Sequence, residues 1–124
     1  MSKFVKVQTE LREARYLKQA LDDLHLAWRE NVTWQHRFSN QQRANAIVVD
    51  APMAAIGFAP DAKGDFELLY DDMQKKSVIA LVGKVRQRYA YHKVLDEAQK
   101  AGFELVEERT GADEVVRLTV RRWT

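Results

Sequence analysis

The sequence predicts an α+β domain, in which two main helices pack on one face of a mostly antiparallel sheet of about five to seven strands. Short runs that alternate apolar and polar residues, the period of a half-buried strand, occur at the beginning, the middle and the end of the chain. Two longer segments between them repeat their apolar residues at helical spacing. The resulting order is one strand, a helix, three or four strands, a helix and two strands. Such an order requires helices on one side of the sheet.

The first elements are a strand and a helix. Between Phe4 and Leu11, apolar Val5 and Val7 alternate with polar neighbours, so this segment predicts a strand. From Arg12 to Leu24 the spacing changes to steps of three and four, which places the apolar residues on one stripe of a helix. These residues are Ala14, Leu17, Leu21 and Leu24.

The middle of the chain predicts a meander of three or four short strands. Turn-forming residues separate the apolar or alternating runs Leu26–Glu30, Ala46–Asp50, Ala54–Phe58 and Phe66–Asp71. Residues 31–45 are rich in Gln, Asn and Arg, yet Trp34, His36 and Phe38 alternate within them. That segment is either a long loop or a protruding hairpin.

A long helix and a hairpin are expected at the end of the chain. Ser77 suits a helix N-cap, and apolar residues recur at helical steps from Val78 as far as Gly102, which fits the left-handed position after a helix. Gly83 decides whether this run is one helix or two. Beyond Phe103, two alternating runs flank a turn at residues 110–113, which predicts an antiparallel hairpin with one charged face.

Composition fits one folded domain over residues 1–124. Of the 124 residues, 46% are hydrophobic and 31% are charged, so a real core can form. A formal net charge of +2 is too balanced to argue by itself for nucleic acid or for an anionic membrane. The chain has no cysteine, which excludes disulfides and thiol chemistry and is typical of a reducing compartment. With neither a secretory signal nor a long apolar run, we expect a cytoplasmic protein without membrane contact.

The last third of the chain carries the most specific motif, Gln87-Arg88-Tyr89-Ala90-Tyr91-His92, together with the terminal Arg121-Arg122-Trp123. With them, the chain strongly resembles a family found in cyanobacteria, algal plastids and other bacteria: the hypothetical plastid reading frame thirty-five family, or domain of unknown function twelve fifty-seven. The resemblance supports the fold, transfers no catalytic residue, and implies a small cytoplasmic or stromal accessory protein. The similar segments are Val7–Thr9, Leu17–Leu24, Ile56–Phe58, Phe66–Leu68, Gln87–His92, Gly102–Glu108 and Leu118–Trp123.

The first candidate site is a basic and aromatic stretch between residues 28 and 43. Aromatic rings that stack on bases and arginines that meet phosphates are typical of single-stranded nucleic-acid binding. Protein interfaces favour the same residue types, so the stretch is equally suited to a protein partner. Its candidate partner-binding residues are Trp28, Arg29, Trp34, His36, Arg37, Phe38 and Arg43.

The second candidate site is the family motif, as a surface or as part of the core. Its residues are Gln87, Arg88, Tyr89, Tyr91, His92, Arg121 and Trp123. We favour tyrosine rings buried against the sheet with hydroxyls at its edge, because catalysis needs a second convergent group in a pocket and the sequence shows none. The histidines lack ligand spacing, so neither a metal nor a cofactor is expected.

These observations favour a non-enzymatic accessory or adaptor protein. We expect it to contact an unidentified protein partner, or a second copy of itself, through an exposed sheet face or through residues 31–45. The alternative is an RNA or single-stranded DNA binding module that uses residues 28–43. A third hypothesis, an enzyme, needs a small pocket with perturbed ionisable groups near Tyr89, Tyr91 and His92.

Overall fold

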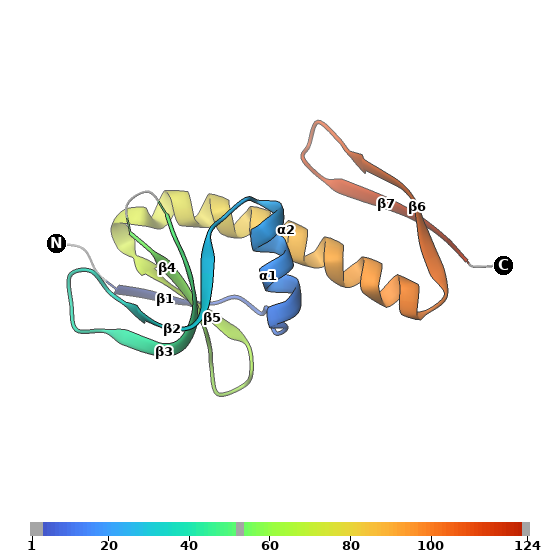
Figure 1. Cartoon of the computed structure of the whole chain (residues 1–124). Coiled ribbons are helices and arrows are strands. Elements are labelled where there is room, and N and C mark those ends of the chain that lie inside the picture. Colours follow the sequence, from blue (N-terminus) through green and yellow to red (C-terminus); the bar gives the residue numbers. More distant parts are fainter. Residues whose placement is uncertain (1–3, 52–53, 123–124) are drawn as a thin grey trace.

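A computed structural model describes residues 4–51 and 54–122 (Figure 1). It confirms the predicted α+β class and the order of the elements, with four strands between the two helices. The elements are β1 (Phe4–Gln8), α1 (Ala14–Asp23), β2 (Trp28–Gln35), β3 (Gln42–Val49), β4 (Ile56–Pro60), β5 (Phe66–Asp71), the 3₁₀ turn η1 (Asp72–Gln74), α2 (Lys75–Lys100), β6 (Phe103–Thr110) and β7 (Val116–Arg122). Trp123, one of the candidate motif residues, lies outside the described residues.

Across the described residues the strands form two antiparallel sheets. The main sheet has the order β1-β5-β4-β3-β2, and β6 pairs with β7 in a separate hairpin. In the main sheet Phe4 pairs with Asp71, and Phe58 pairs with Leu68. Residues 31–45 fall largely within the β2–β3 hairpin. Of the two alternatives for this segment, a long loop or a protruding hairpin, the structure therefore shows the hairpin. The terminal hairpin forms as predicted but does not extend the main sheet.

One face of the main sheet packs against α1 and the first half of α2. Alternate strand residues point to the helices, and Leu17 and Leu21 meet them from the predicted stripe of α1. Full burial of each large apolar side chain contributes about 1.5–3 kcal/mol. The largest fully buried side chains on this side of the sheet are Phe58, Leu17, Leu21, Ile56, Val49 and Val85.

The opposite face of the main sheet is also covered, by Trp34 of β2. A Cβ atom on Gly57 would lie 2.8 Å from the Trp34 ring, so glycine is what lets the indole lie against β4. Phe4 and Trp34 come from opposite edges of the sheet, yet their ring centroids are 5.5 Å apart. The sheet therefore curls until its edges meet at this end. The open sheet face expected as a docking surface is occupied by the protein's own side chains.

Helix α2 continues unbroken through Gly83. A Cβ there would meet nothing within 4 Å, so this glycine faces outward and leaves the helix intact. The helix begins before Ser77, which is not its N-cap, because Asp71 and Gln74 form a capping box on the turn that precedes it. Gly102, with φ +89°, ends the helix in the predicted left-handed conformation.

The second half of α2 extends beyond the main sheet. At about 1.5 Å per residue, its 26 residues span about 39 Å, more than the sheet covers. The hairpin β6–β7 turns back beside this projecting half (Figure 1). We refer to residues 87–122, the end of α2 with the hairpin, as the arm.

Candidate functional site

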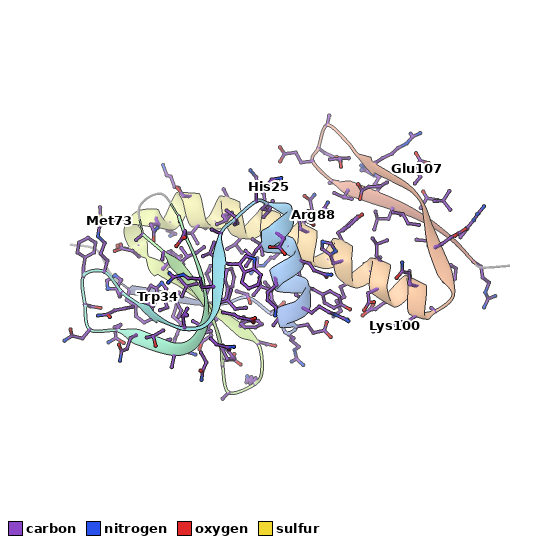
Figure 2. The ribbon with its side chains drawn as sticks, viewed as in Figure 1. His25, Trp34, Met73, Arg88, Lys100 and Glu107 are labelled. Atoms are coloured by element: carbon purple, nitrogen blue, oxygen red, sulfur yellow. The ribbon has the colours of Figure 1, made fainter. Side chains whose placement is uncertain are left out.

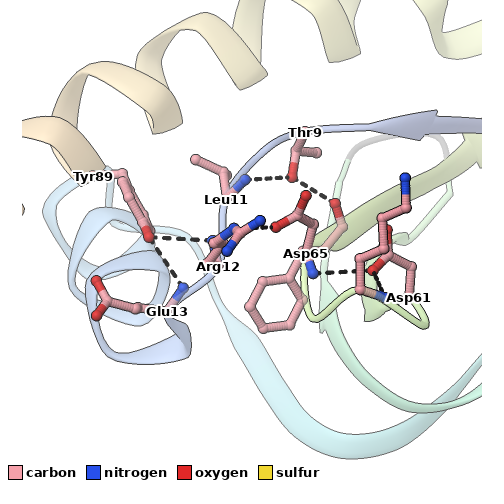
Figure 3. A network of polar contacts seen from close by, with 9 residues as sticks. Thr9, Leu11, Arg12, Glu13, Asp61, Asp65 and Tyr89 are labelled. Carbon is pink, nitrogen blue, oxygen red and sulfur yellow. Dashed lines mark hydrogen bonds and ion pairs between the residues drawn. The ribbon is translucent and has the colours of Figure 1, made fainter.

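Tyr89 of the family motif joins α2 to the beginning of α1. Its ring is buried, and its phenolic oxygen accepts hydrogen bonds from the backbone N–H groups of Arg12 at 3.3 Å and Glu13 at 3.0 Å (Figure 3). The Tyr16 ring packs edge-on against it, with centroids 5.6 Å apart. The Glu13 side chain does not cap α1. The Tyr89 hydroxyl therefore accepts from backbone N–H groups that the first turn of α1 leaves without an intrahelical partner.

The same corner is secured by polar contacts from β1 and β5. The Thr9 hydroxyl donates to the Phe66 carbonyl at 2.6 Å and accepts from the Leu11 N–H at 3.1 Å (Figure 3). Arg12 Nε lies 2.7 Å from Asp65 Oδ1. Each of these groups is bonded to another part of the fold, so the contacts connect the segment between β1 and α1 to the beginning of β5.

Arg88 and His92 meet a single carboxylate oxygen of α1. Asp23 Oδ2 accepts from Arg88 Nε at 2.9 Å and lies 2.6 Å from His92 Nε2. Burial raises the pKa of Asp23, but the hydrogen bonds from Arg88 and His92 outweigh it, and the pKa lies below its usual value. The Arg88 guanidinium also lies 4.0 Å from the centroid of the Tyr91 ring. The cluster ties the end of α1 to the middle of α2.

A second polar cluster lies about one turn beyond His92 on α2 and about two turns before Asp23 on α1. Tyr16 forms a short hydrogen bond to Asp96, and Arg15 and Lys100 lie 2.7 Å and 3.1 Å from the same carboxylate. The hydrogen bond raises the pKa of Tyr16 and lowers the pKa of Asp96. A polar cavity of about 220 Å³ adjoins it, lined by Arg15, Tyr16, Gln19, His92, Leu95, Asp96 and Gln99.

This cavity meets part of what the enzyme hypothesis requires. It is concave, and it contains perturbed ionisable groups beside His92. Tyr89 and Tyr91, however, do not line it. Tyr16 and Asp96 form a hydrogen bond with each other between the helices.

The remaining motif residues hold the hairpin. Gln87 Nε2 donates to the Glu114 carbonyl at 2.5 Å. Burial and a hydrogen bond to Glu108 of β6 raise the pKa of Tyr91. Arg121 pairs with Glu104 across the two strands, on the charged face of the hairpin. The motif therefore lies where α2 meets α1 on one side and the hairpin on the other.

The basic and aromatic stretch does not form one surface. Trp34 and His36 are each only 2% exposed, and Trp34 points into the interior (Figure 2). The Trp34 indole N–H donates to the Ala55 carbonyl at 2.9 Å. His36 Nδ1 lies 2.7 Å from Ser39 Oγ, and Nε2 lies 3.3 Å from Asp71 Oδ2. Both rings are buried and bonded within the fold, so neither presents an open face to a base or to a partner's pocket.

Trp28 and Arg43 are also engaged within the fold. The Trp28 indole N–H donates to Asp22 at 2.7 Å, and its half-buried ring packs on the main core. Arg43 lies 3.0 Å from Glu67 and donates to the Pro60 carbonyl at 2.9 Å. Both side chains therefore have polar partners within the fold.

The outer residues of the stretch remain accessible. Phe38, at the tip of the β2–β3 hairpin, is 56% exposed, and the Arg37 guanidinium lies 5.3 Å from its ring centroid. Arg29 is exposed 3.9 Å from Asp50. A cavity of about 380 Å³ lies behind this tip, lined by Trp34, Gln35, His36, Arg37, Ala54, Ala55 and Asp71.

Sequence reasoning missed an apolar surface on the arm. Between α2 and β7 lies an open cavity of about 260 Å³, with Val94 and Val115 exposed at its margin. The signal available in the sequence was the adjacent pair Val115 and Val116, which interrupts the alternation of apolar and polar residues at the beginning of the last strand. The cavity is lined by Gln87, Ala90, Tyr91, Val94, Val115, Val116 and Leu118.

Residues 4–51 and 54–122 hold no group of three or more histidine, aspartate or glutamate side chains arranged to bind a metal ion. The helices within these residues are too short or too polar to cross a membrane.

Comparisons with known proteins agree with the resemblance carried by the motif. Residues 20–119 match the family described as "Protein of unknown function (DUF1257)". The chain is 31% identical over 127 residues to the uncharacterized protein ycf35 of Pyropia yezoensis, covering 99% of this chain and 98% of the relative. The proteins of the same description from Guillardia theta and Cyanophora paradoxa are 31% and 29% identical, with the same coverage. No solved structure matches. The chain therefore belongs to the DUF1257 family, which includes the plastid ycf35 proteins.

Proposed function

We propose that this is a small cytoplasmic accessory protein that acts through protein contact, and that the arm makes the contact. The observation that carries the proposal is the apolar cavity left open between α2 and β7. Exposed apolar residues that adjoin one another are typical of interaction sites. The exposed large apolar side chains of the arm are Val94, Leu105, Val106, Val115 and Val120, and of these Val94 and Val115 line the cavity.

A partner would stabilise the hairpin, because its own chain covers it only in part. A two-stranded hairpin alone is marginally stable in water and needs a further strand or a helix against its apolar face. Here α2 supplies part of that cover, through Gln87 and Tyr91, while Val94 and Val115 stay exposed beside the cavity. A partner that inserts apolar side chains between α2 and β7 would bury this surface. The partner we propose is therefore a protein with a protruding apolar segment.

Nucleic acid is less well supported by the geometry than a protein. Base stacking needs open aromatic faces. Trp34 is buried, Trp28 is half-buried, and Arg43 is paired with Glu67. The exposed ring left in the stretch is Phe38.

Site-specific photo-crosslinking tests the proposal. A photoreactive residue at Val94 or Val115 should capture one discrete protein in the native host. The same group at Lys63, in the turn between β4 and β5, should not (Figure 1). Val94→Glu should reduce recovery of that protein at least tenfold, about 1.4 kcal/mol, without lowering the melting temperature. Equal crosslinking at Lys63, or recovery unchanged by Val94→Glu, would contradict the proposal.

A further inference from the structure

The first half of α2 carries a basic surface on its outward side. The helix contains seven basic residues and two acidic ones, although the whole chain has a formal net charge of only +2. Figure 1 shows this half of α2 along the outside of the domain, before the part of the helix that the hairpin turns back beside. We refer to residues 75–86 as the ridge. Its exposed basic residues are Lys75, Lys76, Lys84 and Arg86.

The positive charges of α2 differ from those of the remaining surface in lacking acidic partners. Within the described residues, five basic side chains of the helix form no ion pair: Lys75, Lys76, Lys84, Arg86 and Lys93. Outside the helix, Lys63 and Arg122 also form none. Most other basic side chains of the described residues do pair with a carboxylate, namely Lys6, Arg12, Arg15, Lys18, Arg29, Arg43, Arg88, Lys100, Arg109, Arg117 and Arg121. Uncompensated positive charge is therefore concentrated on α2.

Two of these cations lie where the helix itself disfavours them. Lys75 and Lys76 are in the first turn of α2, which contains no acidic residue. The helix dipole places partial positive charge at this end, so cations here destabilise the helix. A sequence that breaks a local rule in this way, without a compensating contact in the fold, is typical of a functional surface.

The ridge projects between two hollows. A cavity of about 280 Å³ separates it from β1, and a second cavity of about 210 Å³ lies on its other flank, beside Leu26 and Ile56. Lys75 and Arg86 both line the first cavity, and they are eleven residues apart, about three turns of helix. They therefore form a row along the β1 side.

A second row follows the other side of the ridge. Lys76 and Lys84 are eight residues apart, just over two turns of helix. The small residues Ala80 and Gly83 lie between the two rows. A Cβ atom on Gly83 would meet nothing within 4 Å, so the helix backbone is open to close approach at this point.

We propose that the ridge enters the major groove of double-stranded DNA and contacts the phosphates on both sides of it. An α-helix with its side chains is about 10–12 Å wide, and the major groove of B-DNA is about 12 Å wide. The two rows of cations match the two phosphate strands that border the groove, and Ala80 and Gly83 let the helix approach closely. These small residues have no group that reads base edges, so binding is independent of sequence.

Other polyanions fit the ridge less well. The major groove of duplex RNA is too narrow and deep for side chains to read. A helix that binds a membrane surface needs a row of exposed apolar residues, and on the ridge Ile79 is the one large apolar side chain that is exposed. The ridge is separate from residues 28–43, and phosphate contact requires no open aromatic ring. DNA binding there goes beyond the proposed function and does not depend on capture of a protein at Val94.

Fluorescence anisotropy with a labelled DNA duplex of about 20 base pairs tests the proposal, because affinity for phosphates falls with salt in proportion to the number of contacts. Four contacts give a slope of log K against log salt concentration of about −3.6. Two duplexes of unrelated sequence should bind alike. Lys75→Gln with Lys76→Gln should halve the slope and weaken binding at least tenfold at about 50 mM salt. The melting temperature of this variant should not fall, since both side chains are exposed and unfavourable to the helix dipole.

The matched control is Lys63→Gln with Arg122→Gln, which removes two cations that also lack an ion pair but lie outside α2. This variant should keep the slope of the parent. An equal loss in the two double variants, or no binding of the duplex at low salt, would overturn the proposal. Tighter binding to duplex RNA or to a single strand would contradict the fit to the DNA major groove. Binding to phosphatidylserine vesicles or to polyglutamate without binding to DNA would instead assign the ridge to a membrane or an acidic protein.

Discussion

The phenolic oxygen of Tyr89 lies 3.0 Å from the backbone nitrogen of Glu13, so a side chain in the middle of α2 holds the residue at which α1 begins. The two residues are 76 positions apart in the chain. This contact shows what the tyrosine of the family motif does in the fold. It gives the buried tyrosine of the motif a structural role at the beginning of α1.

Replacement of Tyr89 by Phe should destabilise the protein by about 1–3 kcal/mol, because the Arg12 and Glu13 N–H groups lose their acceptor while the ring remains. Urea unfolding followed by circular dichroism measures the change. The control is Tyr91→Phe, which removes a hydroxyl bonded to Glu108 on the hairpin and should cost less. A Tyr89→Phe variant as stable as the parent would show that solvent caps these groups equally well.

Asp23 should make the stability of the protein depend on pH at the acid end. Its pKa in the folded state lies below the usual value, so the folded protein binds this proton less readily than the unfolded chain. The stabilisation is therefore complete above the usual carboxyl pKa and is lost as the pH falls through the lower, folded pKa. We expect the parent to be more stable than Asp23→Asn at pH 7, with a gap that narrows below about pH 4.

Urea midpoints of the two proteins at a series of pH values measure this gap. Asp50→Asn is the control, because the Asp50 carboxylate is exposed and lies 3.9 Å from Arg29. A gap between the parent and Asp23→Asn that stayed constant down to pH 3 would mean that the carboxylate gains nothing from Arg88 and His92.

Trp34 and Phe38 should respond very differently to truncation, although both belonged to one predicted surface. Trp34→Ala removes a ring that packs over Gly57 and should cost about 3–5 kcal/mol. Phe38→Ala, at an exposed hairpin tip, should change stability by less than about 0.5 kcal/mol. Thermal unfolding of the two variants measures the contrast. Equal losses would place Phe38 in the core as well.

Much of the local structure could be read from residue spacing. The stripe of Leu17 and Leu21 predicted α1, and Gly102 predicted the end of α2 at its left-handed position. Spacing decides such features because they depend on residues within a few positions of one another. The starting point of α2 could not be read in the same way, because Asp71 caps a 3₁₀ turn that leads into the helix before Ser77.

The candidate sites were less predictable than the elements. Trp34 and His36 alternate with polar residues, a pattern that shows a strand with two faces but does not show which face is buried. The curl of the sheet brought Phe4 within 5.5 Å of Trp34 and closed that face. The open cavity beside Val94 arose because the hairpin covers α2 only in part.

The sequence by itself determined the fold class, the order of the elements and the membership of the family, because periodicity and motif are properties of neighbouring residues. The tertiary structure alone decided which aromatic side chains are buried and that Tyr89 and Arg88 bond to the two ends of α1. It also decided that the arm projects with exposed apolar residues. Those outcomes depend on contacts between segments that are distant in sequence, such as Arg88 with Asp23 and Trp34 with Phe4. Such contacts follow from how the sheet curls and from how α1 and the hairpin pack against α2, and neither has a local signature in the chain.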